Sequence, residues 1–344
     1  MDADQAIEHL VGMQAQSPLA PYIGLWTRLQ DFAIEDLASL LTQRRAVRGT
    51  SLRKTLHLHT DRDYLRIRPL MQGILDAEAR RNSTFGKDLV TGLDIAAVMA
   101  AGKRAVEERP RTGTELRELL SRQWPERDPF ALWHVVVCAL PLVQIPPRGL
   151  WGQSGQVTLT TVEAWLDGSM DEVTDAGSLL MRYLAAFGPA STADIRTWSG
   201  LPGIRAVLQH LRPQLRTFTD VRGRELFDVP DGRLPDPDDF AAPRFLPEFD
   251  NVLLSHDDRS RIVPEHLQVR VHRSLGKPML LVDGKVAATW KLIRSGATKA
   301  RIEISPFEKI VPAETTAVLG EADRLLNFAA SEATDRDVRF MPLP

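Results

Sequence analysis

The stretch from Ala176 to Val229 alternates helix and turn signals in an order that few folds can accommodate. Apolar residues with helical spacing run over residues 176–187, 192–199 and 203–212, and glycine or proline separates the segments. Two short alternating segments follow, over residues 215–220 and 225–229, on either side of a glycine. This order predicts a helix-turn-helix with a β-wing, whose core would be formed by Ile195, Trp198, Leu201, Ile204 and Leu208.

Weaker forms of the same pattern precede this unit. Helical spacing over residues 4–11, 22–30 and 34–42 leads to a basic segment and then to an alternating strand over residues 55–60. A capping box at Thr112–Glu115 predicts a helix over residues 116–122, Asp128 caps another over 129–139, and strands are expected over 142–145 and 156–161. Three related units in one chain predict a tandem array.

The C-terminal part has a different composition. A Pro- and Asp-rich linker over residues 230–243 is followed by a hairpin signal, in which Asp283–Gly284 is a type I′ turn between strands. A further strand is expected over 299–304 and a long helix over 313–330. The predicted fold is α+β, with tandem winged-helix units followed by a β-rich C-terminal domain with a long helix. The predicted domains are 1–68, 69–168 (a helical connection and the second unit), 169–232 and 233–344.

Composition limits the cellular compartment in which the protein can be expected. Its 344 residues are 43% hydrophobic and 26% charged, as in globular proteins, and its apolar runs are too short to span a membrane. The acidic start at Met1–Asp4 lacks the features of a signal peptide, and the single Cys138 excludes a disulfide framework. We therefore expect a cytoplasmic protein with no membrane partner.

Positive charge is concentrated in two segments although the net charge is only −2. Residues 44–68 carry eight Lys or Arg against two acidic residues, and residues 270–301 carry eight against one. Such clusters are typical of surfaces that bind the DNA backbone, so we expect binding that is largely independent of base sequence and weakens with salt.

Two glutamines spaced two residues apart, Gln14 and Gln16, follow a helical segment that ends at Gly12. In an extended segment this period places both amides on one face and Ala15 on the other. An amide donates and accepts hydrogen bonds without carrying charge, so the pair can hold a water and the polar edge of a base without repelling a cationic substrate. The alternative is that both are solvated loop residues.

Other polar clusters have competing interpretations. His57 and His59 on one strand face, with Asp61 or Asp63, suggest a metal site, but a polar cleft lined by His57 is favoured over a metal. The exposed loop over residues 146–152, with Arg148 and Trp151, suits contact with DNA or packing between domains. One further alternative is that Glu248 and Asp250 form ion pairs with Arg259 and Arg261. Another is a hydrolytic triad of Ser255, His256 and Asp258, which is disfavoured because residues so close in sequence seldom converge on one site.

Taken together, the motifs resemble those of the AlkZ-type (YcaQ-like) winged-helix DNA glycosylases over nearly the whole chain. The resemblance is carried by Gln14-Ala15-Gln16, by Thr55-Leu56-His57-Leu58, by residues 140–152, by Arg244-Phe245-Leu246-Pro247-Glu248-Phe249-Asp250-Asn251, and by Asp283-Gly284 before Trp290. It implies three tandem winged helices and a monofunctional glycosylase that excises N7-alkylated purines from double-stranded DNA. It also implies unhooking of interstrand crosslinks and catalysis by Gln14 and Gln16.

We assign DNA contacts to a second set of residues, namely Arg48, Arg53, His57, Arg148, Trp151, Arg244, Asn251 and Arg259. No cofactor and no metal are expected, and the protein is expected to act as a monomer associated with the nucleoid. Two other functions remain open. A transcription regulator would read bases with Arg205, Gln209 and His210, and a damage- or drug-binding protein would confer self-resistance without catalysis.

Overall fold

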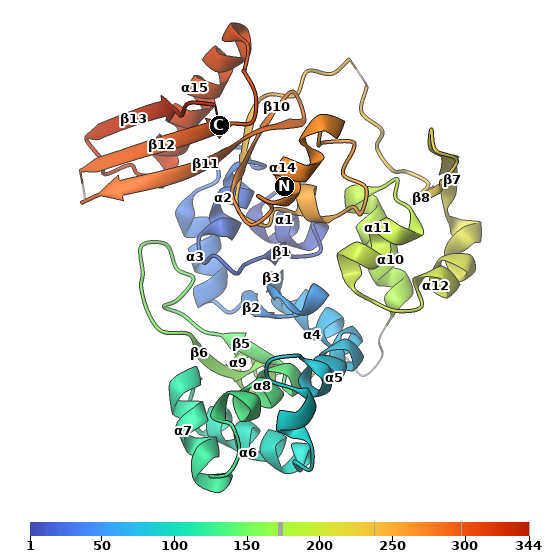
Figure 1. Cartoon of the computed structure of the whole chain (residues 1–344), viewed down its shortest axis with the longest axis vertical. Helices are drawn as coiled ribbons and strands as arrows, with labels where there is room; N and C mark the ends of the chain where they lie inside the picture. The colour runs from blue at the N-terminus through green and yellow to red at the C-terminus, as the bar shows by residue number, and fades with distance from the viewer. Residues whose placement is uncertain (171–174, 237, 297, 344) are drawn as a thin grey trace. The chain divides into compact units, whose positions relative to one another are not determined.

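Contacts within the computed structural model divide the chain into two units (Figure 1). The first comprises Met1–Leu19 with Ile34–Gly232, and the second comprises Ala20–Ala33 with Arg233–Pro344. The structure describes residues 1–170, 175–236, 238–296 and 298–343. Residues 171–174 of the predicted third unit and residue 237 of the predicted linker lie outside this set. The described chain is a mixture of helices and strands, as predicted.

A six-stranded sheet is the centre of the first unit, with strand order β1-β3-β2-β5-β6-β4. Its strands are β1 (Met13–Gln14), β2 (Ala46–Thr50), β3 (Leu56–Thr60), β4 (Arg111–Thr112), β5 (Leu142–Gln144) and β6 (Thr158–Thr161). All neighbouring strands are antiparallel. The β2–β5 pairing matches Gly49 with Val143, so the strands predicted separately for residues 1–68 and 69–168 form one sheet.

A glycine makes this sheet possible. A Cβ atom on Gly49 would lie 2.4 Å from the Tyr64 hydroxyl, so only glycine lets the buried ring lie against β2. The hydroxyl donates to the carbonyl of Leu142 at 3.0 Å and to that of Thr50 at 3.3 Å. Tyr64 therefore ties the carbonyls of two segments far apart in sequence.

Ten α-helices of the described first unit have the following bounds: α1 Ala3–His9, α3 Ile34–Thr42, α4 Asp61–Leu70, α5 Gln72–Arg81, α6 Ile95–Glu108, α7 Gly113–Gln123, α8 Pro129–Ala139, α9 Val162–Leu166, α10 Ala176–Phe187 and α11 Thr192–Ser199. Short 3-10 helices lie at Leu52–Lys54, Lys87–Val90 and Arg212–Gln214. The predicted caps are confirmed, because Thr112 and Glu115 form a capping box on α7 and Asp128 accepts from the Ala131 amide on α8. Helices α6, α7 and α8 pack on one another around a core that includes Leu116 and Val136.

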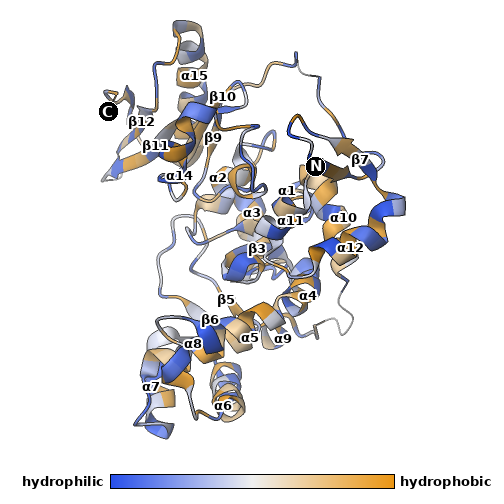
Figure 2. Cartoon of the chain, turned by 45° about the vertical axis from the view of Figure 1, so that its right-hand side comes forward, coloured by the Kyte–Doolittle hydropathy of each residue, from blue (hydrophilic) through white to orange (hydrophobic). Residues whose placement is uncertain are grey.

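The helix α12 (Ile204–Leu211) and the hairpin of β7 (Arg216–Thr219) and β8 (Glu225–Asp228) complete the first unit. Hydrophobic and hydrophilic positions alternate around α10 and α12 (Figure 2). The five predicted core residues are all buried, namely Ile195, Trp198, Leu201, Ile204 and Leu208. The predicted order of three helices and two strands is therefore present at residues 176–228.

The second unit contains a five-stranded sheet with the order β13-β12-β11-β10-β9. Its elements are α2 Ala20–Trp26, β9 Arg244–Leu246, α13 Asn251–Leu254, α14 Gln268–His272, β10 Met279–Val282, β11 Lys285–Ser295, β12 Lys299–Pro306, α15 Pro312–Ala329 and β13 Asp335–Phe340, with a 3-10 helix at Glu265–Leu267. The predicted hairpin is confirmed, since Asp283 and Gly284 both have positive φ between β10 and β11. Strands β9 and β13 were not predicted.

Residues 20–33 pack in the second unit, whereas the sequence pattern grouped them with residues 1–68. The ring centroids of Trp26 and Phe32 each lie 5.8 Å from that of Phe328 on α15. Two large aromatic side chains need an apolar partner, and a residue nearly 300 positions away supplies it. None of the helices in the described ranges has both the length and the hydrophobicity needed to cross a bilayer.

Candidate active site

The two glutamines occupy an extended segment at the edge of the six-stranded sheet. Gln14 pairs with His57 of β3, and the Ala15 amide donates to the Leu56 carbonyl at 2.8 Å. Gln14 Nε2 donates to Gln16 Oε1 at 2.6 Å, so both amides lie on one side of the segment. The two amides are paired as predicted, although the strand ends at Gln14 and Gln16 lies in a bend. Gln14 is 7% exposed whereas Gln16 is exposed, so one amide is held by the protein and the other faces solvent.

A glycine turns the chain from α1 into this segment. Gly12 has φ +92°, and a Cβ atom there would lie 2.4 Å from the His59 ring. His59 is buried, and its Nε2 lies 2.7 Å from the Ser51 hydroxyl. Burial lowers the pKa of His59 to about 4, so the ring is neutral at physiological pH. The position of the glutamine pair therefore depends on a close approach of backbone to a neutral imidazole.

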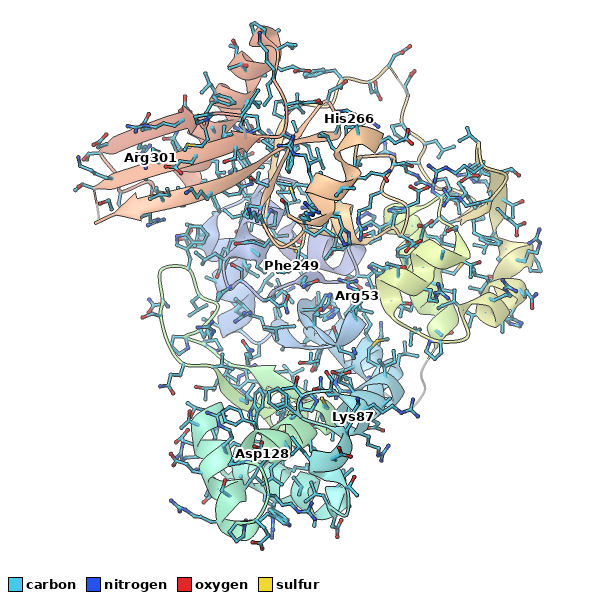
Figure 3. The ribbon with its side chains drawn as sticks, viewed as in Figure 1. Arg53, Lys87, Asp128, Phe249, His266 and Arg301 are labelled. Carbon is cyan, nitrogen blue, oxygen red and sulfur yellow. The ribbon has the colours of Figure 1, made fainter. Side chains whose placement is uncertain are left out.

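A cation, Arg53, contacts this pair directly and lies between β3 and α11 (Figure 3). Its Nη2 donates to Gln14 Oε1 at 3.1 Å and lies 3.3 Å from His57 Nε2, while Nη1 donates to the Trp198 carbonyl at 2.6 Å. Burial lowers the pKa of Arg53 to about 10, which leaves it charged at neutral pH. Burial, and after it the charge of Arg53, lowers the pKa of His57 well below 6.5.

Arg48 is buried, whereas a residue that contacts DNA is expected at the surface. Its side chain is buried, with only 2% of the residue exposed, and Nη2 donates to the Ala15 carbonyl at 2.8 Å. Its Nη1 lies 3.5 Å from the Arg148 carbonyl, and a Cβ atom on Gly149 would lie 2.9 Å from the same nitrogen. Arg48 is thus committed to backbone carbonyls on both sides. Contact of Arg48 with DNA stays a prediction, and the burial of its guanidinium is an argument against it.

The loop over residues 146–152 keeps Arg148 and Trp151 partly exposed. The Arg148 side chain donates from Nη1 to the carbonyl of Gly155, which also lies between β5 and β6, at 3.1 Å. Contact of both residues with DNA remains a prediction. The same is true of Arg205, Gln209 and His210 on α12, which are all exposed.

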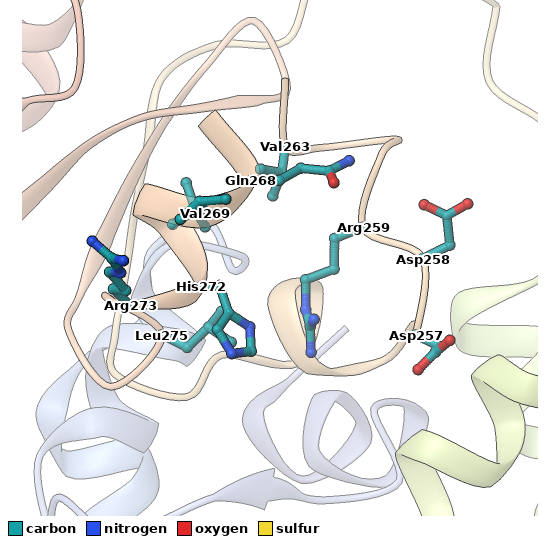
Figure 4. Close-up of a pocket in the computed structure, with 10 residues that line it drawn as sticks. Asp257, Asp258, Arg259, Val263, Gln268, Val269, His272, Arg273 and Leu275 are labelled. Atoms are coloured by element: carbon teal, nitrogen blue, oxygen red, sulfur yellow. The ribbon is translucent and has the colours of Figure 1, made fainter. Parts of the chain in front are cut away.

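The remaining predicted residues lie in the second unit. Arg244 is exposed, with Nη1 3.8 Å from Glu321 Oε1, whereas Asn251 is buried at the start of α13. Arg259 Nε donates to the Leu253 carbonyl at 2.6 Å. Arg259 also lines a cavity of about 350 Å³, in which its side chain lies between His272 and Asp257 in the view of Figure 4. DNA contacts of these three residues remain predictions.

Several alternatives from the sequence have different outcomes. Asp250 forms its ion pair with Arg28, at 2.6 Å, and not with Arg259 or Arg261 as one alternative proposed. Ser255 is buried and its hydroxyl donates to the Asn251 carbonyl at 2.6 Å, as a residue that stabilises a helix end does. In the described ranges no group of three His, Cys, Asp or Glu side chains could hold a metal.

The sequence pattern missed an ion pair that supports the site, and considered Asp63 only as a metal ligand. Asp63 is fully buried and binds both terminal nitrogens of Arg182, each at 2.6 Å, and Arg182 also donates to the Glu8 carbonyl at 2.5 Å. This pair connects the start of α4 and the middle of α10 to α1, which precedes the glutamines. No local signal could have revealed it, because 119 positions separate the two residues.

Comparison with known proteins gives the family. The family model for AlkZ-like DNA glycosylases matches residues 7–328. The solved structure of the Streptomyces sahachiroi DNA glycosylase AlkZ is similar, with a TM-score of 0.73 at 18% identity, covering 99% of this chain and 94% of that one. No curated protein matches. Because the family model spans nearly the whole chain, the protein belongs to the AlkZ-like DNA glycosylases and is an enzyme of DNA repair that acts on DNA.

Proposed function

We propose that this glycosylase hydrolyses the N-glycosidic bond of N7-alkylated purines, using a water held by Gln14 and Gln16. The observation that carries the proposal is the amide pair itself, joined by a hydrogen bond of 2.6 Å at the end of β1. Both side chains are uncharged at every pH, and one of them faces solvent.

The chemistry of the substrate explains why neutral amides suffice. Alkylation at N7 gives guanine a positive charge, so the base leaves readily and the bond from C1′ to N9 breaks through an oxocarbenium-like state. Little acid catalysis is then required. The remaining tasks are to place a water below C1′ and to stabilise the developing positive charge on the sugar, which a positioned amide oxygen can do.

The hydrogen bonds leave suitable groups for this water. Gln14 Nε2 donates one hydrogen to Gln16 and has a second, and Gln16 Oε1 has a second lone pair. A water that accepts from Gln14 and donates to Gln16 would be fixed at two points. His57 does not compete as a general base, because its Nε2 lone pair faces Arg53.

We further propose that the three predicted units, within residues 1–68, 69–168 and 169–232, are winged helices that grip duplex DNA, and that the protein acts as a monomer. Support comes from residues 176–228, where three helices precede a two-stranded hairpin, and from the fact that the glutamines and the side chains around them belong to one unit of one chain. The exposure of Gln16 also favours attack on a base that stays in the duplex. A crosslinked base cannot rotate out while it is tied to the opposite strand, so its excision would unhook the crosslink.

The test is release of free base from a duplex that contains one N7-methylguanine, under single-turnover conditions. Gln14→Ala and Gln16→Ala should each fold and bind DNA as the parent does, yet lose roughly 2 to 4 kcal/mol of transition-state stabilisation, on the order of 10² or more in rate. The double variant should be less than additive if both amides hold one water. Parental activity in the double variant would remove the glutamines from the mechanism.

A further inference from the structure

We infer that Arg53 sets the orientation of the Gln14 amide, and through it that of Gln16, so that Arg53 is a positioning residue for the catalytic water. This inference rests on the proposed function. Its basis is a chain of two hydrogen bonds, from Arg53 Nη2 to Gln14 Oε1 at 3.1 Å and from Gln14 Nε2 to Gln16 Oε1 at 2.6 Å.

The direction of this chain follows from the chemistry of the guanidinium group. Arginine only donates hydrogen bonds, so the Gln14 atom that faces it must be the oxygen. The nitrogen of Gln14 then faces Gln16, and since a nitrogen bearing hydrogens requires an acceptor, Gln16 presents its oxygen. One cation thereby determines the positions of four amide atoms. Without it either amide could rotate by 180°, and the water would meet a mixture of donors and acceptors.

Arg53 is itself held from three directions. Nη1 donates to the Trp198 carbonyl at the end of α11, and Nη2 contacts Gln14 of β1 and His57 of β3. His57 Nδ1 lies 3.0 Å from the Thr55 carbonyl, which can only accept, so the ring proton is on Nδ1 and the Nε2 lone pair accepts from Arg53. The tautomer of His57 is therefore matched to Arg53.

The backbone at this position supports a functional role. Arg53 has φ 53° and ψ 19°, and Lys54 has φ 62°, so two consecutive residues other than glycine adopt the left-handed conformation. Such a conformation is unfavourable for a residue with a Cβ atom and persists only where the surrounding structure holds it. Arg53 reaches into the protein toward Gln14, while the neighbouring Lys54 pairs at the surface with Glu78.

A double-mutant cycle tests the inference. We would measure single-turnover release of N7-methylguanine from duplex DNA for Arg53→Met, Gln14→Ala and the double variant, with DNA affinity and unfolding measured in parallel. Arg53→Met should slow excision roughly tenfold or more, but should change the rate less than about twofold when Gln14 is already alanine. The rates are measured at saturating protein, so that a loss of DNA affinity from the predicted Arg53 contact does not enter the rate of the reaction step.

Arg127→Met is the matched control. Arg127 donates to the carbonyls of Thr91 and Gly92, as Arg53 does to that of Trp198, and belongs to a different part of the first unit. Its loss should leave the excision rate at the parental value. A fall in rate equal to that of Arg53→Met would indicate a general effect of removing a carbonyl-bound arginine, and would overturn the inference.

The outcomes separate the two proposals. If Gln14→Ala alone excises at the parental rate, the proposed function fails regardless of Arg53. If Gln14→Ala is slow but Arg53→Met slows both backgrounds equally, only the inference fails, because Arg53 then acts without Gln14. Should Arg53→Met not fold, Arg53→Lys retains the charge and a donor, and the same comparison in the two Gln14 backgrounds decides the question.

Discussion

Arg28 and Asp250 form a two-point ion pair across 222 positions of the chain, with Nη1 2.9 Å from Oδ2 and Nη2 2.6 Å from Oδ1. The Asp250 side chain is 2% exposed, and its Oδ1 also accepts from the Val252 amide at the start of α13. Arg28, in the turn that follows α2, donates in addition to the Gly24 carbonyl of that helix. The pair therefore joins α2 to the rest of the second unit.

Arg28→Ala should lower the free energy of unfolding by about 3 kcal/mol, because it leaves a buried carboxylate without its cation. Denaturant unfolding of the purified protein measures this loss. Arg28→Lys keeps a charge but only one of the two contacts, so it should be intermediate. Equal stability of Arg28→Ala and the parent would show that water replaces the guanidinium at no cost.

Replacing Gln16 tests the role of charge at the exposed amide. Gln16→Glu should keep measurable excision of N7-methylguanine, because a carboxylate can orient water and favours a positive charge on the sugar. Gln16→Leu, which has a similar size and no polar atom, should be slower by roughly 10². The rates are compared by single-turnover base release. Comparable rates for Gln16→Leu and the parent would mean that Gln16 holds no water.

Arg148→Ala should weaken binding to duplex DNA and leave the unfolding transition nearly unchanged. Its guanidinium donates to the Gly155 carbonyl, which also lies between β5 and β6, so the sheet does not depend on it. A lost phosphate contact should also reduce the dependence of affinity on salt by about one charge. Fluorescence anisotropy titrations at several salt concentrations measure both effects. Normal affinity combined with early melting would show that the loop has a packing role.

Stability should fall as the pH drops below 6.5, because His59 is buried in its neutral form. Its pKa is about 4 in the folded protein against 6.5 when exposed, so between these values the unfolded chain binds more protons than the folded one. Acid therefore favours unfolding, with a loss of about 3 kcal/mol from this residue by pH 4. Urea unfolding at pH 7 and pH 4.5 measures the loss. His59→Gln retains a partner for Ser51, and its free energy of unfolding should differ less between the two pH values. If the difference is the same as in the parent, the effect belongs to other groups.

Local patterns were sufficient to predict some elements and not others. The core at Ile195 and Trp198, the Asp283–Gly284 turn and the pairing of the glutamine amides each depend on a few neighbouring residues, and all three are present. The pairing of β2 with β5 depends on two positions in each strand, separated by roughly a hundred residues, and no periodicity in either strand indicates it.

In the candidate site, too, some residues could be predicted from the sequence and others could not. Gln14 and Gln16 could be identified from their spacing, but the burial of Arg48 could not, since an arginine in a basic segment is ordinarily solvated. Here the carbonyl oxygens of Ala15 and Arg148 take the place of water around its guanidinium. Gly149 was the available signal, because its missing side chain leaves the space that Arg48 occupies.

The assignment of residues 20–33 to the second unit has a consequence for how the gene can be divided. A cut at the linker after Gly232 would leave α2 on the N-terminal fragment, with Trp26 and Phe32 deprived of Phe328. The C-terminal fragment would lack the arginine that neutralises Asp250. Neither fragment should fold stably when expressed alone. The two fragments produced together should associate through α2, as the halves of a split protein do.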